Sequence, residues 1–124
     1  MNKKILEKFG DSENCPIRNI LDRIGDKWSM LVLLLLNEEK VLRFNEMHKY
    51  IGTISQKMLS VTLKSLESDG LVQRTVYPQV PPKVEYQLTE RGLSLIPHLQ
   101  KIAEWAKQNF SAITKSRDEF AKVS

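Results

Sequence analysis

Two adjoining stretches decide the fold: SQKMLSVTLKSLESDG at residues 55–70 and LVQRTVYPQVPPKVEYQL at residues 71–88. In the first, Leu59, Leu63 and Leu66 lie within about 40° of one another on a helical wheel, because the α-helix has about 3.6 residues per turn. These leucines predict a buried stripe. The second stretch is rich in β-branched and aromatic residues on both sides of a proline cluster, which is typical of a two-stranded β-ribbon.

The opposite side of the predicted helix is small, hydrogen-bonding and basic. Ser55 is a suitable N-cap and Gly70 a suitable C-cap. The outer arc consists of Lys57, Ser60, Val61, Lys64 and Ser68, with Gln56 at its edge. It carries no acid, since Glu67 and Asp69 lie off it toward the carboxyl end. A helix of this kind is narrow enough to enter the major groove of DNA.

The predicted ribbon has a stiff tip. Apolar and polar residues largely alternate in strands 72–77 and 84–88. Three prolines between them remove three backbone donors, so residues 78–83 form a projecting tip that ends in Lys83. A narrow basic helix followed at once by such a wing predicts a DNA-binding module.

The preceding residues supply the remaining helices. Apolar residues recur at helical spacing in 17–24, where Pro16 suits a first turn, and a dense apolar helix is expected over 26–36 on an Asp26 cap. A polar turn at 37–40 and a possible short strand at 41–44 come next. Asn45 is expected to cap a third helix, which the tight turn Gly52-Thr53-Ile54 joins to the helix at 55–70, as in a helix-turn-helix unit.

The carboxyl-terminal part predicts a long amphipathic helix. Thr89 opens it, and Leu95, Leu99, Ile102 and Ala106 follow a 4-3-4 spacing. Pro97 should bend it or start a new segment, and residues 111–124 are expected to be helical. The helix has more apolar surface than one small core needs, which indicates docking of a second copy of the chain.

These expectations define an α+β fold, mainly α: a winged helix-turn-helix with a two-stranded β-wing and terminal dimerisation helices. A chain of 124 residues is long enough for one core and too short for two. We therefore expect a single domain over 1–124. Its parts are a leader at 1–14, the DNA-binding core and wing at 15–88, and dimerisation helices at 89–124.

The composition is compatible with a DNA-binding protein but does not establish one. The net charge of +4 has the sign expected of a nucleic-acid binder, but the surplus is spread along the chain. The longest apolar run, Met30 to Leu36, has seven residues, against the roughly 20 that a bilayer crossing needs. With no secretory signal in the first residues, we expect a cytoplasmic protein without membrane contact.

The residues for enzymatic or metal chemistry are scattered. Cys15, His48 and His98 have no paired spacing for a zinc site, and the five glycines never cluster into a phosphate-binding loop. The adjacent acids Glu38 and Glu39 are expected to be a solvated turn pair. We therefore expect no metal, no cofactor and no enzymatic activity.

The sequence supports two interpretations of Cys15. Cys15-Pro16 lies at the expected start of the first helix, where the helix dipole and unpaired amides favour a thiolate. A lone cysteine is more commonly a small buried hydrophobe. As a single cysteine it forms no internal disulfide, which suits a reducing compartment. The residues alone leave both readings open.

The chain resembles the HxlR family of bacterial and archaeal winged helix-turn-helix transcriptional regulators. The resemblance runs from Cys15 to about Trp105. It rests on six ordered blocks: Cys15-Pro16, Ile24-Gly25-Asp26-Lys27-Trp28, Arg43-Phe44-Asn45-Glu46-Met47, Ile54-Ser55-Gln56-Lys57-Met58-Leu59, residues 66–74 and the wing at residues 77–89.

The resemblance implies a homodimer that binds a roughly palindromic operator on double-stranded DNA through its winged domains. The residues that would face the groove are Ser55, Gln56, Lys57, Ser60 and Lys64. Arg43 would hold a backbone phosphate, and Lys83 would reach the flanking backbone or minor groove. Several members sense oxidants or electrophiles through the cysteine that matches Cys15. With no second cysteine, only an intersubunit bridge, a mixed disulfide or an adduct would be open to this chain.

Two other functions are compatible with the same fold. One is a winged-helix protein-interaction module without DNA binding, although the Lys-Ser-Lys face argues against it. The other is a redox sensor whose main output is thiol chemistry. The operator, the regulated genes, the choice between repressor and activator, and any small-molecule effector are left open by the sequence.

Overall fold

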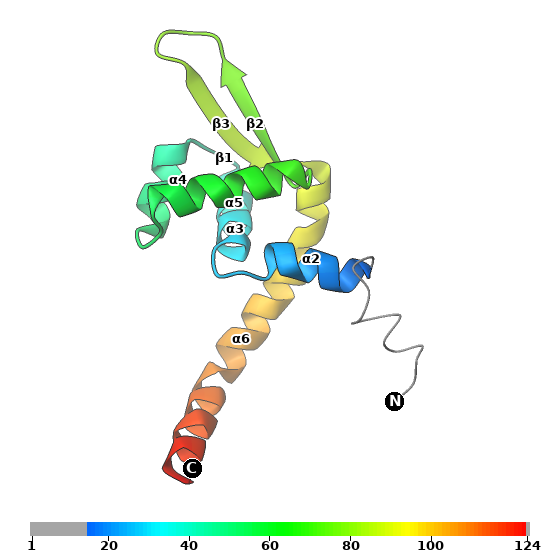
Figure 1. The fold of residues 1–124 in the computed structure, drawn as a ribbon, viewed down its shortest axis with the longest axis vertical. Coiled ribbons are helices and arrows are strands. Elements are labelled where there is room, and N and C mark those ends of the chain that lie inside the picture. Colours follow the sequence, from blue (N-terminus) through cyan, green and yellow to red (C-terminus); the bar gives the residue numbers. More distant parts are fainter. Residues whose placement is uncertain (1–14, 124) are drawn as a thin grey trace.

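The computed structural model describes residues 15–123 of the chain (Figure 1). The predicted leader at 1–14 lies outside the described residues. The elements, labelled as in Figure 1, are α2 (Pro16–Ile24), α3 (Ser29–Glu39), β1 (Val41–Leu42), α4 (Phe44–Ile51), α5 (Gln56–Ser68), β2 (Val72–Tyr77), β3 (Lys83–Leu88) and α6 (Glu90–Val123). The β2–β3 ribbon projects at one end of the long axis, and α6 extends to the other.

The sheet confirms the winged fold and adds a strand to it. Its order is β1-β3-β2, with both pairs antiparallel. The ladder of β2 and β3 runs from the Val72–Leu88 pair to the Tyr77–Lys83 pair. The two-residue β1 pairs with the base of β3, so the predicted two-stranded wing is anchored in a three-stranded sheet.

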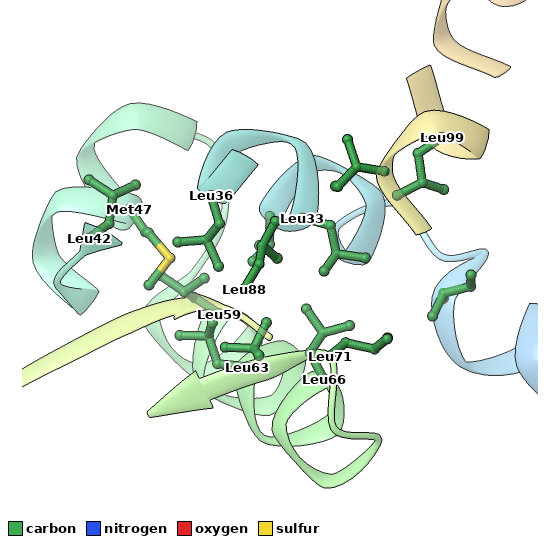
Figure 2. Packing of buried hydrophobic residues seen from close by; sticks show 14 of the residues in the cluster. Leu33, Leu36, Leu42, Met47, Leu59, Leu63, Leu66, Leu71, Leu88 and Leu99 are labelled. Carbon is green, nitrogen blue, oxygen red and sulfur yellow. The ribbon is translucent and has the colours of Figure 1, made fainter. Parts of the chain in front are cut away.

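Helix α3 lies at the centre of the molecule. It contacts the other four helices and also β1 and β3. Val32, Leu33 and Leu36 are fully buried, as expected for the densest apolar run of the sequence. Figure 2 shows leucines of α3 and α5 and Met47 of α4 meeting beside the sheet. This core fixes the rotation of α5 and therefore determines which of its faces is exposed.

The ends of α3 differ from the prediction. Asp26 does not begin the helix, which starts at Ser29; instead its carboxylate accepts hydrogen bonds from the backbone N–H groups of Trp28 and Ser29 and from the Ser29 hydroxyl. Partial burial acts to raise the pKa of Asp26, but the hydrogen bonds from Ser29 and Trp28 outweigh it and hold that pKa below its usual value. The predicted turn at 37–40 is wrong, because helix-favouring glutamates carry α3 through Glu39.

The start of α4 also differs. Asn45 was expected to cap this helix, but the N-cap residue is Arg43, with extended backbone. The Arg43 N–H donates to Glu46 Oε1 at 2.8 Å, so the acid of the first turn supplies the capping contact. The helix therefore begins at Phe44, with only Arg43 between it and the short strand β1.

The carboxyl-terminal helix is continuous. Pro97 was expected to bend the helix or to start a new segment; no new segment begins there, since α6 runs from Glu90 to Val123 as one helix of 34 residues. A proline removes a single backbone donor, and the many remaining hydrogen bonds of a long helix maintain it. The expected helicity of residues 111–123 is confirmed.

Candidate DNA-binding interface

The amino-terminal end of α5 is built by local capping. Gly52 adopts φ 74°, which favours glycine, and turns the chain after α4. Ser55 has extended backbone, and its Oγ accepts the Met58 N–H at 3.0 Å, as its predicted role as N-cap requires. The buried stripe of Leu59, Leu63 and Leu66 then packs into the core. The first turn of α5 is thus fixed in place with its amino end accessible.

The predicted outer face of α5 lies at the surface. Gln56, Lys57 and Lys64 are exposed with Ser55, and Ser60 is half-buried. Within residues 15–123, neither lysine takes part in an ion pair. The lysines are therefore available to an anionic partner. Their role in DNA contact stays a prediction.

Arg43 lies between α4 and the wing. Its side chain is exposed, and it lines a hollow of about 450 Å³ that also contains Pro82 and Val84 of the ribbon. A phosphate that approached this hollow would meet one guanidinium beside the base of the wing tip. Binding of a phosphate by Arg43 also stays a prediction.

The sequence predicted Lys83 at the end of the wing tip, but Lys83 does not lie there. It is the first residue of β3 and pairs with Tyr77, because only the prolines and their neighbours at 78–82 are excluded from the ladder. Lys83 Nζ lies 3.4 Å from Glu85 Oε2 and 5.3 Å from the centre of the Tyr77 ring. The outermost tip, Pro78-Gln79-Val80-Pro81-Pro82, has no charged residue.

Sequence reasoning missed the charges between α5 and the ribbon. Arg74 of β2 lies across from Glu67 of α5, with 3.6 Å between Nε and Oε1. The only sequence signal was a basic residue in the strand that directly follows the basic helix. Burial raises the pKa of the neighbouring Tyr86; the charge of Arg74 opposes that shift and the charge of Glu67 adds to it.

A second missed cluster holds the carboxyl end of α5. Arg23 of α2 donates from Nε to both carboxylate oxygens of Asp69, at 2.7 and 2.9 Å, and from Nη2 to Ser65 and Ser68 Oγ, at 3.3 and 3.0 Å. The Asp69 carboxylate raises the pKa of Arg23. Ser68, placed on the outer arc by the sequence, belongs to this cluster. Arg91 of α6 donates to the Asp69 carbonyl at 3.1 Å, so α2 and α6 both hold this end of α5.

Cys15 is the N-cap residue of α2, and its carbonyl accepts the Asn19 N–H at 3.0 Å. The residue is only 2% exposed. Its burial agrees with a structural role, whereas its position at a helix start agrees with a reactive thiol. The described geometry leaves both readings open.

Two further findings concern residues 15–123 alone. None of the helices formed there is both long and apolar enough to cross a membrane. No three potential metal ligands among histidine, cysteine, aspartate and glutamate come together in the same region.

A capped second helix, a helix-turn-helix turn and an adjacent β-wing define a winged helix-turn-helix protein. The profile of the HxlR-like helix-turn-helix family matches residues 23–114. An HTH-type transcriptional regulator of Halalkalibacterium halodurans is 47% identical over 102 residues, which cover 82% of this chain and 90% of that protein. The chain therefore belongs to the HxlR family of HTH-type transcriptional regulators, and it is not an enzyme.

Solved structures agree with this assignment. The redox regulator HypR in its reduced form is 41% identical, with a TM-score of 0.75 over 81% of this chain and 98% of that one. The reduced form of the regulator YodB from B. subtilis is 39% identical, with a TM-score of 0.67 over 76% of this chain and 92% of that one. The chain is similar to both over most of its length.

Proposed function

We propose that this chain is a sequence-specific DNA-binding transcriptional regulator that acts as a homodimer on a roughly palindromic operator in the cytoplasm. The observation that carries the proposal is the exposed face of α5, on which Lys57 and Lys64 lie outside any ion pair of residues 15–123. Unpaired cations on a narrow capped helix suit the major groove, because backbone phosphates supply much of the binding energy and base edges supply the sequence preference.

Individual roles follow from side-chain chemistry. Lysine pairs with guanine edges and glutamine with adenine edges, so Lys57 and Gln56, near the start of α5, are the proposed base readers. Ser55, Ser60 and Lys64 would contact bases or phosphates along the same face. Arg43 and Lys83 flank α5 on the side of the wing and would bind backbone phosphates.

Dimerisation is supported by apolar side chains left exposed on α2 and α6. These are Ile17, Ile20, Leu21, Leu93, Ile102, Trp105, Phe110, Phe120 and Val123. Several exposed apolar side chains on one pair of helices often mark an interface, and closed twofold pairing is the commonest form of such interfaces. A twofold dimer would present two α5 helices to two half-sites, which is why a palindromic operator is expected.

The proposal is tested by selecting bound sequences from a pool of random duplex DNA and titrating the winning duplex. Lys57→Ala should weaken binding by about 1–3 kcal/mol and relax the base preference at one position of each half-site. Lys107→Ala, the same change at an exposed position of α6, is the matched control. If the Lys57→Ala variant binds the selected duplex as tightly as the parent protein, the assignment of α5 as the recognition helix is wrong. Binding that did not depend on salt would instead favour a protein-interaction module.

A response to oxidants or electrophiles is the second proposed property. It is supported by the position of Cys15 at the start of α2 and by the similarity to HypR, which is described as a redox regulator. Because Cys15 is buried, the start of α2 would have to open before its thiol could react. Treatment with diamide followed by a non-reducing gel should yield a covalent dimer that is absent from Cys15→Ser. Absence of both a dimer and a mass change at Cys15 would contradict sensing.

A further inference from the structure

A hollow between α5 and the wing places one acid beside the proposed DNA-facing side of α5. The hollow measures about 250 Å³ and is lined by Ser60, Leu63, Lys64, Glu67, Arg74 and Tyr86. Glu67 is the single acidic residue among the 13 residues of α5. An acid at this position would repel DNA phosphates, so the presence of Glu67 beside Lys64 and Arg74 needs an explanation.

The acid and Arg74 form a weak, accessible ion pair. Glu67 Oε1 lies 3.6 Å from Arg74 Nε, beyond ordinary hydrogen-bond length, and the two side chains are 41% and 44% exposed. Exposed pairs of this kind contribute little net stability, since water and salt screen both charges. The guanidinium can therefore leave Glu67 at little cost to the fold.

A phosphate would be a better partner for the same guanidinium. Arginine binds phosphate oxygens with short, often bidentate, charge-assisted hydrogen bonds. Arg74 lies on β2 at the junction of the wing with α5, where Lys64 already lines the hollow. A duplex seated on α5 would bring its backbone to this junction, because the backbone flanks the groove that the helix occupies.

We propose that Arg74 is a further phosphate-binding residue and that Glu67 is its competing partner, holding it in the unbound protein and released from it by duplex DNA. The proposal rests on the function proposed above. Glu67 thereby restrains binding to the backbone of any sequence, because the loss of its ion pair and its repulsion of phosphate oppose every complex that uses Arg74. Glu67 sets the strength and salt dependence of binding and leaves base preference to Gln56 and Lys57.

The test uses the full chain with the selected duplex and with a random-sequence duplex, titrated over a range of salt concentrations. Arg74→Gln should weaken binding to both duplexes and flatten the plot of log affinity against log salt by about one unit. Glu67→Gln should tighten binding to both and steepen the slope by up to about one, so that its advantage over the parent grows on the order of threefold when salt is lowered fourfold. In the Arg74→Gln background, the gain from Glu67→Gln should fall to less than half.

The matched control is Glu119→Gln, which removes the same charge near the carboxyl end of α6. It should leave the slope unchanged. The inference is overturned if Glu67→Gln behaves like Glu119→Gln, or if Arg74→Gln weakens binding with no change of slope, since a purely structural role would do that. If the parent protein binds neither duplex, the proposed function itself fails, and that result is distinct from failure of the variants.

Discussion

Among the glycines of residues 15–123, Gly92 leaves the least room for a Cβ atom, and we expect Gly92→Ala to be destabilising. A Cβ atom there would stand 2.2 Å from the carbonyl oxygen of Leu71 and 3.3 Å from Leu88 Cδ2. The oxygen belongs to the backbone, so no side-chain rotation relieves the contact. The start of α6 would have to move away from the α5–β2 turn by roughly 1.2 Å, which would lengthen the 2.2 Å approach to the 3.4 Å of an ordinary van der Waals contact.

The hydrogen bonds at this junction set the size of the effect. The Leu71 carbonyl accepts the Thr89 N–H at 3.1 Å, and Thr89 Oγ1 accepts the Gly92 N–H at 3.1 Å while donating to the Gly70 carbonyl. Overpacking costs about 1–3 kcal/mol and loss of one buried hydrogen bond about 1–1.5 kcal/mol. The gain in helix propensity from glycine to alanine offsets about 1 kcal/mol. The net expectation is a loss of about 2 kcal/mol from the free energy of unfolding.

Urea denaturation followed by circular dichroism measures this loss directly. The control is Gly52→Ala, because no heavy atom outside the adjoining residues lies within 4 Å of the Cβ position of Gly52. With φ 74° at Gly52, alanine should cost about 1 kcal/mol through backbone strain alone. If Gly92→Ala proves no more destabilising than Gly52→Ala, the packing of α6 on the α5–β2 turn is not as described.

Three further changes test separate parts of the molecule. Lys83→Ala should weaken binding to all DNA sequences alike and flatten the salt slope by about one unit, as gel-shift titrations would show; a change confined to one sequence would contradict a backbone role. Asp26→Ala should lower the free energy of unfolding by about 1 kcal/mol through loss of the contacts at the start of α3. Because hydrogen bonds lower the pKa of Asp26, its contribution is present above the ordinary carboxyl pKa and is lost as pH falls through the lowered value; urea titrations of the variant in acid should therefore converge with the parent. Ile102→Asp, at a side chain that is 54% exposed, should leave the fold intact and yield monomers in sedimentation, whereas a persistent dimer would move the interface elsewhere.

The winged fold was predictable because its determinants are local. The caps of α5, its leucine stripe and the proline cluster of the wing lie within one continuous stretch, 55–88. Each acts through neighbours in sequence: a hydroxyl caps the helix that follows it, and a proline removes its own donor. The exposure of Lys57 and Lys64 followed from the helical period alone.

Element ends were less predictable, since several signals compete there. Asp26 caps α3 from outside the helix, and Glu46 supplies the contact expected of Asn45. The polar residues 37–39 suggested a turn but continue α3. Glutamate is polar, as turn residues usually are, but it also has a high helix propensity. Lys83 was displaced from the tip by one further pair in the ladder, which alternation in a single strand does not reveal.

The charge clusters were beyond prediction because they join distant parts of the chain. Arg23 and Asp69 are 46 residues apart, and neither lies in a pattern that names the other as its partner. The pair of Glu67 and Arg74 depends on the angle at which the ribbon leaves α5. A long-range pair of this kind follows from packing, which the local periodicity of helix and strand does not specify.

The contacts of Arg23 and Arg91 link the two proposed activities of the chain. Both arginines bind Asp69 at the carboxyl end of α5, and they come from α2 and α6, the helices whose apolar side chains are exposed. A dimer formed through α2 and α6 would therefore fix the position of each α5 through direct hydrogen bonds. Cys15 is the N-cap residue of the nine-residue helix that carries Arg23. Any displacement of α2 that starts at Cys15 would therefore reach α5 through Arg23. Because a palindromic operator fixes the distance between half-sites, such a displacement would change affinity without altering any residue that touches DNA.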